Sequence, residues 1–308
     1  MHNYLRRSSP AALAATAGAF MAVVLVAGGA GVMPAAHAQA GAVTMFVSVL
    51  DREGAPVPGL QASEFVIREN GVRREVLRVT QPATEPIDIA LVVDNTTAST
   101  PYVMDIRKGV TAFIEALHAT HFISLVTIAD RPVIYVDFTH SLDQLRAGVG
   151  RLFPITGSGS YMMDAVIDLS RGFLKRKSER AAIVALSADG PEFSDISYQQ
   201  ALEALAAGGA SLNVIVINPR AGATSSEATR GRMIVFDRGP QQSGGVRLDA
   251  MSSMALPARF GLLATQLANQ YRVVYSRPES LIPPDRFEVS VTRPGLQAHG
   301  TPARPRNP

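Results

Sequence analysis

The sequence predicts an α/β fold, in which helices cover both faces of a mainly parallel sheet, together with a small β module. From Ile87 onward, nearly continuous apolar runs alternate with segments whose apolar residues recur at helical spacing. Runs of the first kind are typical of strands buried on both faces, and their alternation with helices is typical of a parallel sheet. We place this α/β domain at residues 87–276.

The expected elements of the α/β domain follow from these two patterns. Strands are expected at residues 87–93, 122–128, 133–136, 181–186 and 212–217. Helices are expected at residues 103–117, 142–149, 161–175, 198–207 and 257–269. Residues 218–250 have a loop-like composition, and a strand at 271–275 is expected to close the unit.

A β module is predicted at residues 39–82, ahead of the α/β domain. Within it, Asn70-Gly71 lies between two strand-like runs at 65–68 and 76–79. Asn-Gly between such runs is a strong hairpin signal, because both residues accept a positive φ. A lone hairpin is only marginally stable in water, so we expect the C-terminal strand at 287–291 to pack against this module.

The N-terminus has the pattern of a secretory signal peptide. Arg6-Arg7 precede an apolar run at 11–32, and the small-residue triplet Ala36-His37-Ala38 follows it. We therefore predict a signal peptide over residues 1–38, cut before Gln39. Two alternatives stay open: a retained membrane anchor, because the apolar run is nearly long enough to span a bilayer, and a twin-arginine signal.

The composition agrees with export and excludes several function classes. With no cysteine, the chain has no disulfide, no thiolate metal site and no cysteine nucleophile. The predicted signal peptide holds two of the 29 basic residues and none of the 26 acidic ones, so the mature chain carries a formal charge of +1. A nearly balanced charge does not predict a nucleic-acid surface. After cleavage we expect no stable membrane span, a strand and Pro-rich tail over 277–308, and a periplasmic, cell-envelope or secreted location.

Polar residues follow the predicted strands at the edge where sheets of this kind bind ligands. They lie in Asp94-Asn95-Thr96-Thr97, in Gly157-Ser158-Gly159-Ser160 and in Ser187-Ala188-Asp189-Gly190. Because ligands bind outside the carboxyl ends of parallel strands, two carboxylates and several hydroxyls are expected to meet there. Such hard oxygen ligands suit Mg²⁺, Mn²⁺ or Ca²⁺. Asp94 is expected at the surface, where its replacement by alanine would leave the fold intact.

Four segments occur in an order that is characteristic of a known family. They are Val47–Leu60, Phe65 through Glu69-Asn70-Gly71, residues 267–275 and residues 286–293. In this order the sequence resembles the von Willebrand factor A (VWA) domain superfamily, and within it the bacterial exported group called VWFA-related. The resemblance covers nearly the whole mature chain and implies a Rossmann-like VWA domain with a flanking β module.

The resemblance also implies a metal-ion-dependent adhesion site. Its first motif, Asp-x-Ser-x-Ser, aligns with Asp94-x-Thr96-x-Ala98, while Ser160 and Asp189 correspond to its second-loop threonine and its distal aspartate. In the family these groups hold a divalent cation directly or through water, and a carboxylate of the partner protein completes its shell. Alanine cannot coordinate, so Mg²⁺ or another divalent cation is expected on Asp94, Thr96, Ser160 and Asp189, with water at the open position. The alternative is that both aspartates cap helices and turns.

Other candidate residues fit a function less well. His118 and His121 resemble a metal pair only superficially, because the glutamate of the helical zinc motif is absent and both are expected at a helix end. Ser158 and Ser160 lack the Gly-x-Ser-x-Gly turn of a hydrolase nucleophile. Glu192 could tune the charge of the metal site, but a solvated loop position is the favoured interpretation.

These observations predict an exported, non-enzymatic protein that acts as a protein–protein binding module, through a degenerate adhesion site. The partner is expected to be a protein that offers an acidic side chain. One alternative is a metal-independent structural or assembly subunit of an envelope complex. A metal-assisted hydrolase is disfavoured, because no motif brings a histidine or lysine base to the region of Asp94 and Asp189.

Overall fold

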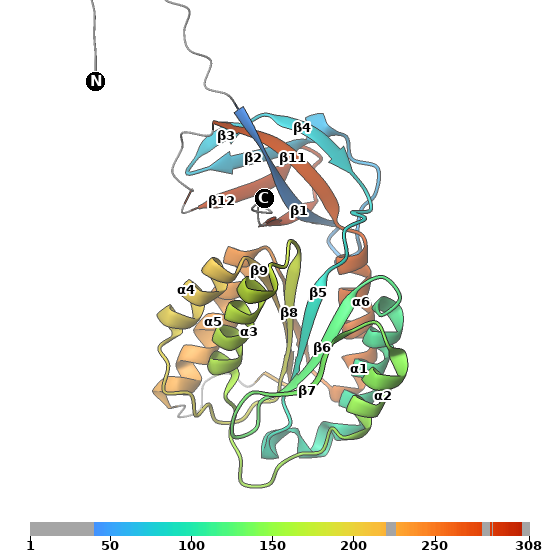
Figure 1. Cartoon of the computed structure of the whole chain (residues 1–308), viewed down its shortest axis with the longest axis vertical. Coiled ribbons are helices and arrows are strands. Elements are labelled where there is room, and N and C mark those ends of the chain that lie inside the picture. Colours follow the sequence, from blue (N-terminus) through green and yellow to red (C-terminus); the bar gives the residue numbers. More distant parts are fainter. Residues whose placement is uncertain (1–39, 220–225, 279–283, 285, 304–308) are drawn as a thin grey trace, which may run out of the picture. The chain divides into compact units, whose positions relative to one another are not determined.

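The computed structural model of the 308-residue chain describes residues 40–219, 226–278, 284 and 286–303 (Figure 1). The predicted signal peptide over residues 1–38, its cleavage point and the end of the Pro-rich tail lie outside the described residues. Within the described ranges, no helix combines the length and the apolar character that crossing a bilayer requires.

A six-stranded sheet forms the centre of the α/β part of the chain. Its strand order is β10-β9-β8-β5-β6-β7, and all neighbours are parallel except β6 with β7. The strands are β5 (Asp88–Val93), β6 (Phe122–Thr127), β7 (Val133–Thr139), β8 (Ala181–Ser187), β9 (Ala210–Ile217) and β10 (Arg247–Ala250). β8 and β9 are buried along their whole length, as strands covered on both faces must be. The predicted mainly parallel sheet is confirmed.

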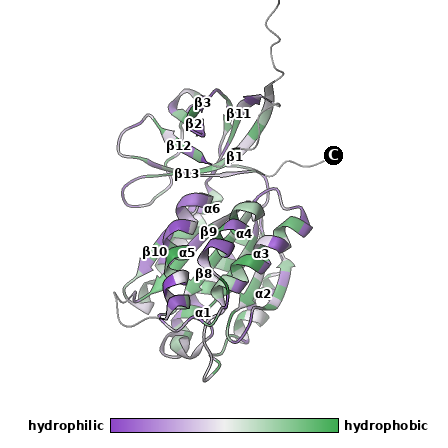
Figure 2. Cartoon of the chain, turned by 90° about the vertical axis from the view of Figure 1, so that its left-hand side faces the viewer, coloured by the Kyte–Doolittle hydropathy of each residue, from purple (hydrophilic) through white to green (hydrophobic). Residues whose placement is uncertain are grey.

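Helices cover both faces of this sheet (Figure 1). The first face packs against α1 (Val103–Leu117), α2 (Leu142–Gly150) and α6 (Leu256–Ala268). The second face packs against α3 (Met162–Arg176), α4 (Tyr198–Gly208) and α5 (Glu227–Ser243). Short 3₁₀ helices are η1 (Ala62–Glu64), η2 (Thr97–Tyr102) and η3 (Ser253–Ala255). Figure 2 shows hydrophilic and hydrophobic residues alternating along α3, α4 and α5, as expected for helices with one side against a sheet.

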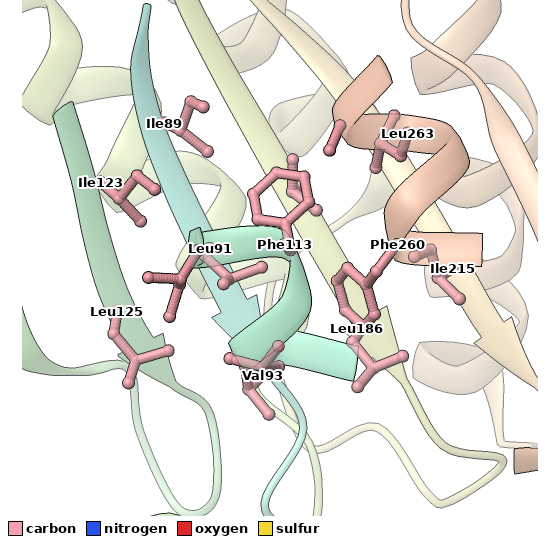
Figure 3. Packing of buried hydrophobic residues seen from close by; sticks show 14 of the residues in the cluster. Ile89, Leu91, Val93, Phe113, Ile123, Leu125, Leu186, Ile215, Phe260 and Leu263 are labelled. Atoms are coloured by element: carbon pink, nitrogen blue, oxygen red, sulfur yellow. The ribbon is translucent and has the colours of Figure 1, made fainter. Parts of the chain in front are cut away.

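The core on the first face is built from alternate residues of the strands (Figure 3). Ile89, Leu91 and Val93 of β5 belong to it, while the residues between them belong to the core on the second face. Phe113 of α1 meets Phe260 of α6 edge-on, with 5.7 Å between the ring centroids. This arrangement of aromatic rings is favourable beyond the apolar area that it buries.

Helix α5 contradicts the loop predicted over residues 218–250. The helix begins after Ser226, whose side chain caps it, and ends at Gly244, which has a left-handed φ of 77°. Gly239-Pro240 inside the helix disfavour helical structure and hide its periodicity. The prediction is wrong because tertiary packing overrides these propensities: Phe236 is fully buried against the sheet.

The β part of the chain consists of two sheets that share one core. The larger has the order β13-β1-β11-β4 and the smaller β12-β2-β3, with antiparallel pairing throughout. The strands are β1 (Ala40–Leu50), β2 (Phe65–Glu69), β3 (Val72–Arg74), β4 (Val76–Thr80), β11 (Tyr271–Pro278), β12 (Phe287–Val291) and β13 (Gln297–Pro302). Met45, Phe65 and Tyr271 are buried together in the shared core. The expected packing of the C-terminal strand on the N-terminal module is confirmed, because β12 pairs with β2.

Two strand assignments made from the sequence are wrong. The turn at Asn70-Gly71, with φ values of 48° and 81°, joins β2 to β3, whereas Val76–Thr80 belongs to the larger sheet. The strand predicted at 271–275 does not close the α/β sheet, because β11 pairs with β1 and β4. Alternate residues of β11 enter the core of the β part, while Arg272 between them pairs with Glu85. This alternation suits an antiparallel sheet with one buried face.

Candidate functional site

The candidate site lies at the edge of the sheet where two neighbouring strands end. β5 and β8 are parallel neighbours, but the chain leaves β5 toward α1 on one face and leaves β8 toward α4 on the other. Loops that diverge in this way leave a crevice at the carboxyl ends of the strands. Asp94 directly follows β5, and Asp189 lies two residues beyond β8.

Asp94 is buried and connects these two strands. Only 1% of its surface is exposed. Its Oδ1 accepts a hydrogen bond from Thr96 N at 3.0 Å, and its Oδ2 accepts one from Ala188 N at 2.9 Å. Burial raises the pKa of Asp94, while the Thr96 hydroxyl and the two backbone N–H groups act in the opposite direction. The expectation of a surface residue is wrong, and alanine here would leave two buried N–H groups without an acceptor.

Two buried hydroxyl groups lie beside the carboxylates at this edge. They are Thr96 Oγ1 and Ser160 Oγ, which act to lower the pKa of Asp94 and of Glu192, respectively, although neither forms a hydrogen bond of good geometry. A buried hydroxyl that is poorly satisfied by its neighbours is available to a further ligand. Hydroxyl and carboxylate oxygens are ligands for hard divalent cations. The chemistry of Asp94, Thr96 and Ser160 therefore fits the cation that the sequence resemblance implies.

Ser160 is fixed by its own backbone between two loops. It forms isolated β-bridges with Ala129, which follows β6, and with Glu192, which follows β8. Its carbonyl oxygen accepts a hydrogen bond from Phe193 N at 2.8 Å. Asn95 adds the loop after β5, because its Oδ1 accepts a hydrogen bond from Ala129 N at 2.9 Å. Three strand-end loops therefore meet around Ser160.

Asp189 and Ala98 differ from the buried, oxygen-bearing residues at the other positions of the predicted motif. Asp189 is exposed, and within the part of the chain that the structure describes no three His, Cys, Asp or Glu side chains are grouped to hold a metal ion. Its neighbour Gly190 packs on the loop after β5: a Cβ added there would lie 2.7 Å from Ala98 Cβ and 3.7 Å from Thr96 Oγ1. The two loops are thus in contact, and the assignment of four metal ligands stays a prediction.

The site also contains a buried ion pair that the sequence did not reveal. Glu192, predicted as a solvated loop residue, is 2% exposed, and its Oε1 accepts hydrogen bonds from Met163 N and Ser194 Oγ. Arg232 of α5 is 1% exposed, lies 3.5 Å from Glu192 Oε2 and donates a hydrogen bond to Gly190 O at 2.8 Å. Burial raises the pKa of Glu192, and Arg232 opposes this rise. The prediction for Glu192 is wrong because donors from three elements surround its carboxylate.

The polar centre consists of Asp94, Thr96, Ser160, Glu192 and Arg232, which are all buried. The Ser160 hydroxyl lies close enough to the Glu192 carboxylate to lower its pKa. Glu192 is occupied by the donors around it and by Arg232. What the centre offers is a set of oxygen ligands beside a fixed positive charge.

Two of the six histidines, His118 and His121, have separate hydrogen-bond partners. His118 Nδ1 lies 3.1 Å from His140 O, whereas His121 Nδ1 accepts a hydrogen bond from Ile87 N at 3.3 Å. Burial lowers the pKa of His121 to about 4, so its ring is uncharged at neutral pH. Both residues therefore contribute to the packing at the C-terminal end of α1.

Comparisons with known proteins find similarity in fold and not in sequence. No protein-family model matches the chain, and no curated protein matches it. Among solved structures, the D319A mutant of the PilB minor pilin from Streptococcus sanguinis is 12% identical over 61% of this chain and 62% of the pilin, with a TM-score of 0.43. The vWF domain of the type V pili tip protein Mfa5 from Porphyromonas gingivalis is 11% identical over 60% of this chain and 96% of that one (TM-score 0.46).

A third similar structure covers more of the chain. The von Willebrand factor type A protein from Catenulispora acidiphila is 12% identical over 86% of this chain and 74% of its own, with a TM-score of 0.47. These similarities concern the fold alone, and this chain spans less than two thirds of the pilin. The order of the six strands and the helices on both faces give the α/β part a VWA-like fold, as the sequence resemblance implied.

Proposed function

We propose that this chain is an exported protein-binding module whose contact surface is the sheet edge around Asp94, Thr96 and Ser160. The observation that carries the proposal is a set of exposed apolar side chains at this edge, which we call the apolar ring. Among the described residues of the α/β part, every exposed large apolar side chain except Leu174 belongs to it. Its members are Met104, Val133, Ile134, Phe153, Ile155, Phe193, Met251 and Met254. Exposed apolar residues that gather on one surface mark interaction sites.

The two aromatic members of the apolar ring are held in position. Phe153 is 60% exposed, and the guanidinium of Arg107 lies 4.2 Å from its ring centroid while donating a hydrogen bond to Leu152 O. Phe193 is 48% exposed and lies against Gly159, where an added Cβ would come within 2.5 Å of the ring. Aromatic side chains that are fixed in this way lose little conformational freedom on binding.

The apolar ring and the polar centre are parts of the same loops. Ile155 N donates a hydrogen bond to Asn95 O at 2.8 Å, and Ile155 O accepts one from Thr97 Oγ1. Phe193 N donates to Ser160 O. A partner on the ring therefore also contacts the loops that enclose the buried centre. The proposed partner is a protein that places an acidic side chain over the centre and apolar side chains against the ring.

Removal of both aromatic rings should weaken partner binding strongly. Buried aromatic anchors dominate the affinity of protein interfaces, so we expect the Phe153→Ser/Phe193→Ser variant to bind at least roughly 30-fold more weakly. The immobilised protein would be exposed to an envelope extract of the producing cell, and the captured proteins quantified by mass spectrometry. Leu174→Ser is the matched control, because Leu174 is 43% exposed but lies at the opposite end of α3. Equal capture by both variants would contradict the proposal.

Metal binding is the finer part of the proposal. Ala98→Ser restores the missing hydroxyl, so we expect Mg²⁺ or Mn²⁺ to bind roughly tenfold more tightly, a gain of about 1.4 kcal/mol. Asp94→Asn removes the charge but keeps an oxygen acceptor for one buried N–H group, and we expect no binding at millimolar ion. Calorimetric titration of the wild type and both variants measures this. If Ala98→Ser binds no ion, the assignment of the site is wrong.

A metal-independent binding mode is the second candidate. Two observations favour it: Ala98 offers no ligand, and Arg232 already supplies a positive charge to the centre. In this mode the protein acts as a structural or assembly subunit and grips its partner through the apolar ring. The same calorimetric titration separates the two modes. In the metal-independent mode the wild type gives no heat of ion binding, whereas the Ala98→Ser variant binds the ion. In neither mode do we propose an enzymatic activity.

We also propose that the functional form begins at Gln39. The basic start at Arg6-Arg7, the apolar run at 11–32 and the triplet Ala36-His37-Ala38 support export and cleavage. N-terminal sequencing of the protein recovered from the producing cell should therefore read from Gln39, or from within one or two residues of it. Recovery of the full-length chain, held firmly in the inner membrane, would instead support the anchor.

A further inference from the structure

The seven methionines that follow the predicted signal peptide differ sharply in exposure. One of them, Met233, is half-buried. Three lie in the cores: Met45, Met162 and Met163. The other three are exposed, with exposed fractions of 61% at Met104, 72% at Met251 and 81% at Met254. These three belong to the apolar ring, so the proposed contact surface holds every freely exposed thioether in the part of the chain that the structure describes.

The three exposed methionines lie on neighbouring segments of one sheet edge. Met104 is the second residue of α1, which begins beyond the end of β5, and Met251 directly follows β10. Since β5 and β10 belong to the parallel part of the sheet, both positions lie at its carboxyl edge. Ser253 Oγ donates a hydrogen bond to Asp105 Oδ2 at 2.6 Å. This bond holds the segment that carries Met251 and Met254 against the start of α1.

Thioether sulfur is the group in this chain that an oxidant attacks most readily. The chain contains neither cysteine nor tryptophan, and the susceptibility of a thioether follows its exposure. A lone pair on the sulfur attacks one oxygen of hydrogen peroxide, so an S–O bond forms and the O–O bond breaks. The leaving hydroxide takes up a proton and departs as water. The sulfur loses two electrons, the peroxide gains them, and the product is methionine sulfoxide.

Oxidation would change the character of the contact surface. A methionine side chain is apolar and flexible, which suits contact with an apolar partner. The oxygen of a sulfoxide accepts hydrogen bonds from water, and these are lost without compensation when an apolar surface covers it. Met104, Met251 and Met254 are three of the eight members of the apolar ring. Their oxidation therefore makes one side of the ring polar, while the buried methionines keep the cores unchanged.

We propose that Met104, Met251 and Met254 are reversible oxidation sites, at which hydrogen peroxide converts the contact surface from apolar to polar and thereby releases the bound partner. Methionine sulfoxide reductases return the sulfoxides to thioethers, and binding is regained. This inference deepens the proposed function, because it assigns a regulation to the same surface, and it rests on that function for the identity of the surface.

The first measurement needs no partner. The purified protein is treated with dilute hydrogen peroxide, catalase stops the reaction, and mass spectrometry of the peptides gives the oxidation rate of each methionine. We expect the three exposed methionines to react at least roughly tenfold faster than Met45, Met162 and Met163. The oxidised protein should elute earlier from a phenyl resin, because its surface has become more polar. Its thermal unfolding midpoint should shift by less than about 2 °C, since exposed positions contribute little to stability.

The second measurement is partner capture from the envelope extract. After peroxide and catalase, the wild type should capture partner at least roughly tenfold less well than before, because the oxidised side of the ring no longer offers apolar contacts. Incubation with methionine sulfoxide reductases and dithiothreitol should restore capture. The reductant itself leaves the protein unchanged, because a chain without cysteine has no disulfide to reduce.

A triple leucine variant is the matched control. Met104→Leu/Met251→Leu/Met254→Leu keeps apolar side chains of similar volume, but these side chains cannot be oxidised by peroxide. The variant should capture partner both before and after the treatment, and its retention on the phenyl resin should not change. A loss of capture that arose from oxidation elsewhere in the chain would appear in this variant as well.

Three outcomes would overturn the proposal: equal oxidation of the exposed and the buried methionines, unchanged phenyl retention of the oxidised wild type, or an equal loss of capture in the leucine variant. Undiminished capture by the oxidised wild type would overturn it too. Failure of the proposed function is a different result, because the untreated wild type and the Phe153→Ser/Phe193→Ser variant would then capture the same proteins in equal amounts.

Discussion

Replacing Glu69 by alanine should lower the free energy of unfolding by about 3–5 kcal/mol, because it removes one side of a buried charged cluster. Glu69 Oε2 lies 2.9 Å from Arg74 Nε and 3.6 Å from Arg277 Nε, and its Oε1 accepts a hydrogen bond from Tyr275 OH at 3.0 Å. The glutamate is buried at the end of β2, and its partners come from β3 and β11. Its loss would leave two guanidinium groups without their common carboxylate.

The measurement is urea denaturation followed by circular dichroism, since the chain contains no tryptophan. Glu115→Ala is the control, because Glu115 pairs with Arg146 at the surface, where both side chains are largely exposed. Exposed pairs contribute about 0–1 kcal/mol. An equal loss in Glu69→Ala and Glu115→Ala would show that the cluster does not stabilise the β part.

Replacing Phe260 by alanine should cost about 3–5 kcal/mol, through lost burial and the cavity left behind. Its ring is fully buried between the sheet and α1, where it meets Phe113 (Figure 3). Gly109 of α1 leaves the room for it, since a Cβ there would lie 2.7 Å from Phe260 Cδ2. Leu174→Ala, at an exposed position, should change the free energy of unfolding far less.

A double-mutant cycle tests the packing directly. Gly109→Ala alone should be destabilising, because the added Cβ collides with the ring. In the Phe260→Ala background the collision with the ring is absent and only the 3.2 Å approach to Leu256 Cβ remains, so Gly109→Ala should cost less there, offset by the higher helix propensity of alanine, worth about 1 kcal/mol. Additive effects of the two substitutions would contradict this contact.

Much of the α/β part could be predicted because its strands and helices are indicated by residues that lie close together in the sequence. The apolar runs at 87–93, 181–186 and 212–217 correspond to β5, β8 and β9, and the helical spacings correspond to α1, α2, α3, α4 and α6. Strands that are buried on both faces have few polar residues, so the composition of a single strand indicates that it is buried. Placing Asp94 and Asp189 at one edge then required only the rule that parallel strands end together.

The ion pair of the site could not be predicted in the same way. Ser226 followed by Glu227 is a helix-start signal that could have revealed α5, but Gly239-Pro240 masked its periodicity. Even with α5 recognised, nothing local distinguishes a buried arginine from an exposed one. Arg232 is buried because Glu192, 40 residues earlier, is brought to it by the fold.

The sequence by itself determined the layered α/β architecture, the hairpin turn at Asn70-Gly71 and the oxygen-rich character of the strand-end loops, since each depends on residues that are close in the chain. Only the tertiary structure decided that β11 joins the β part, that Asp94 is buried and that Arg232 pairs with Glu192. The physical reason is that burial and charge compensation depend on partners far away in sequence. A local pattern describes what a side chain is able to do, whereas its environment, and hence its charge and its exposure, is a property of the assembled fold.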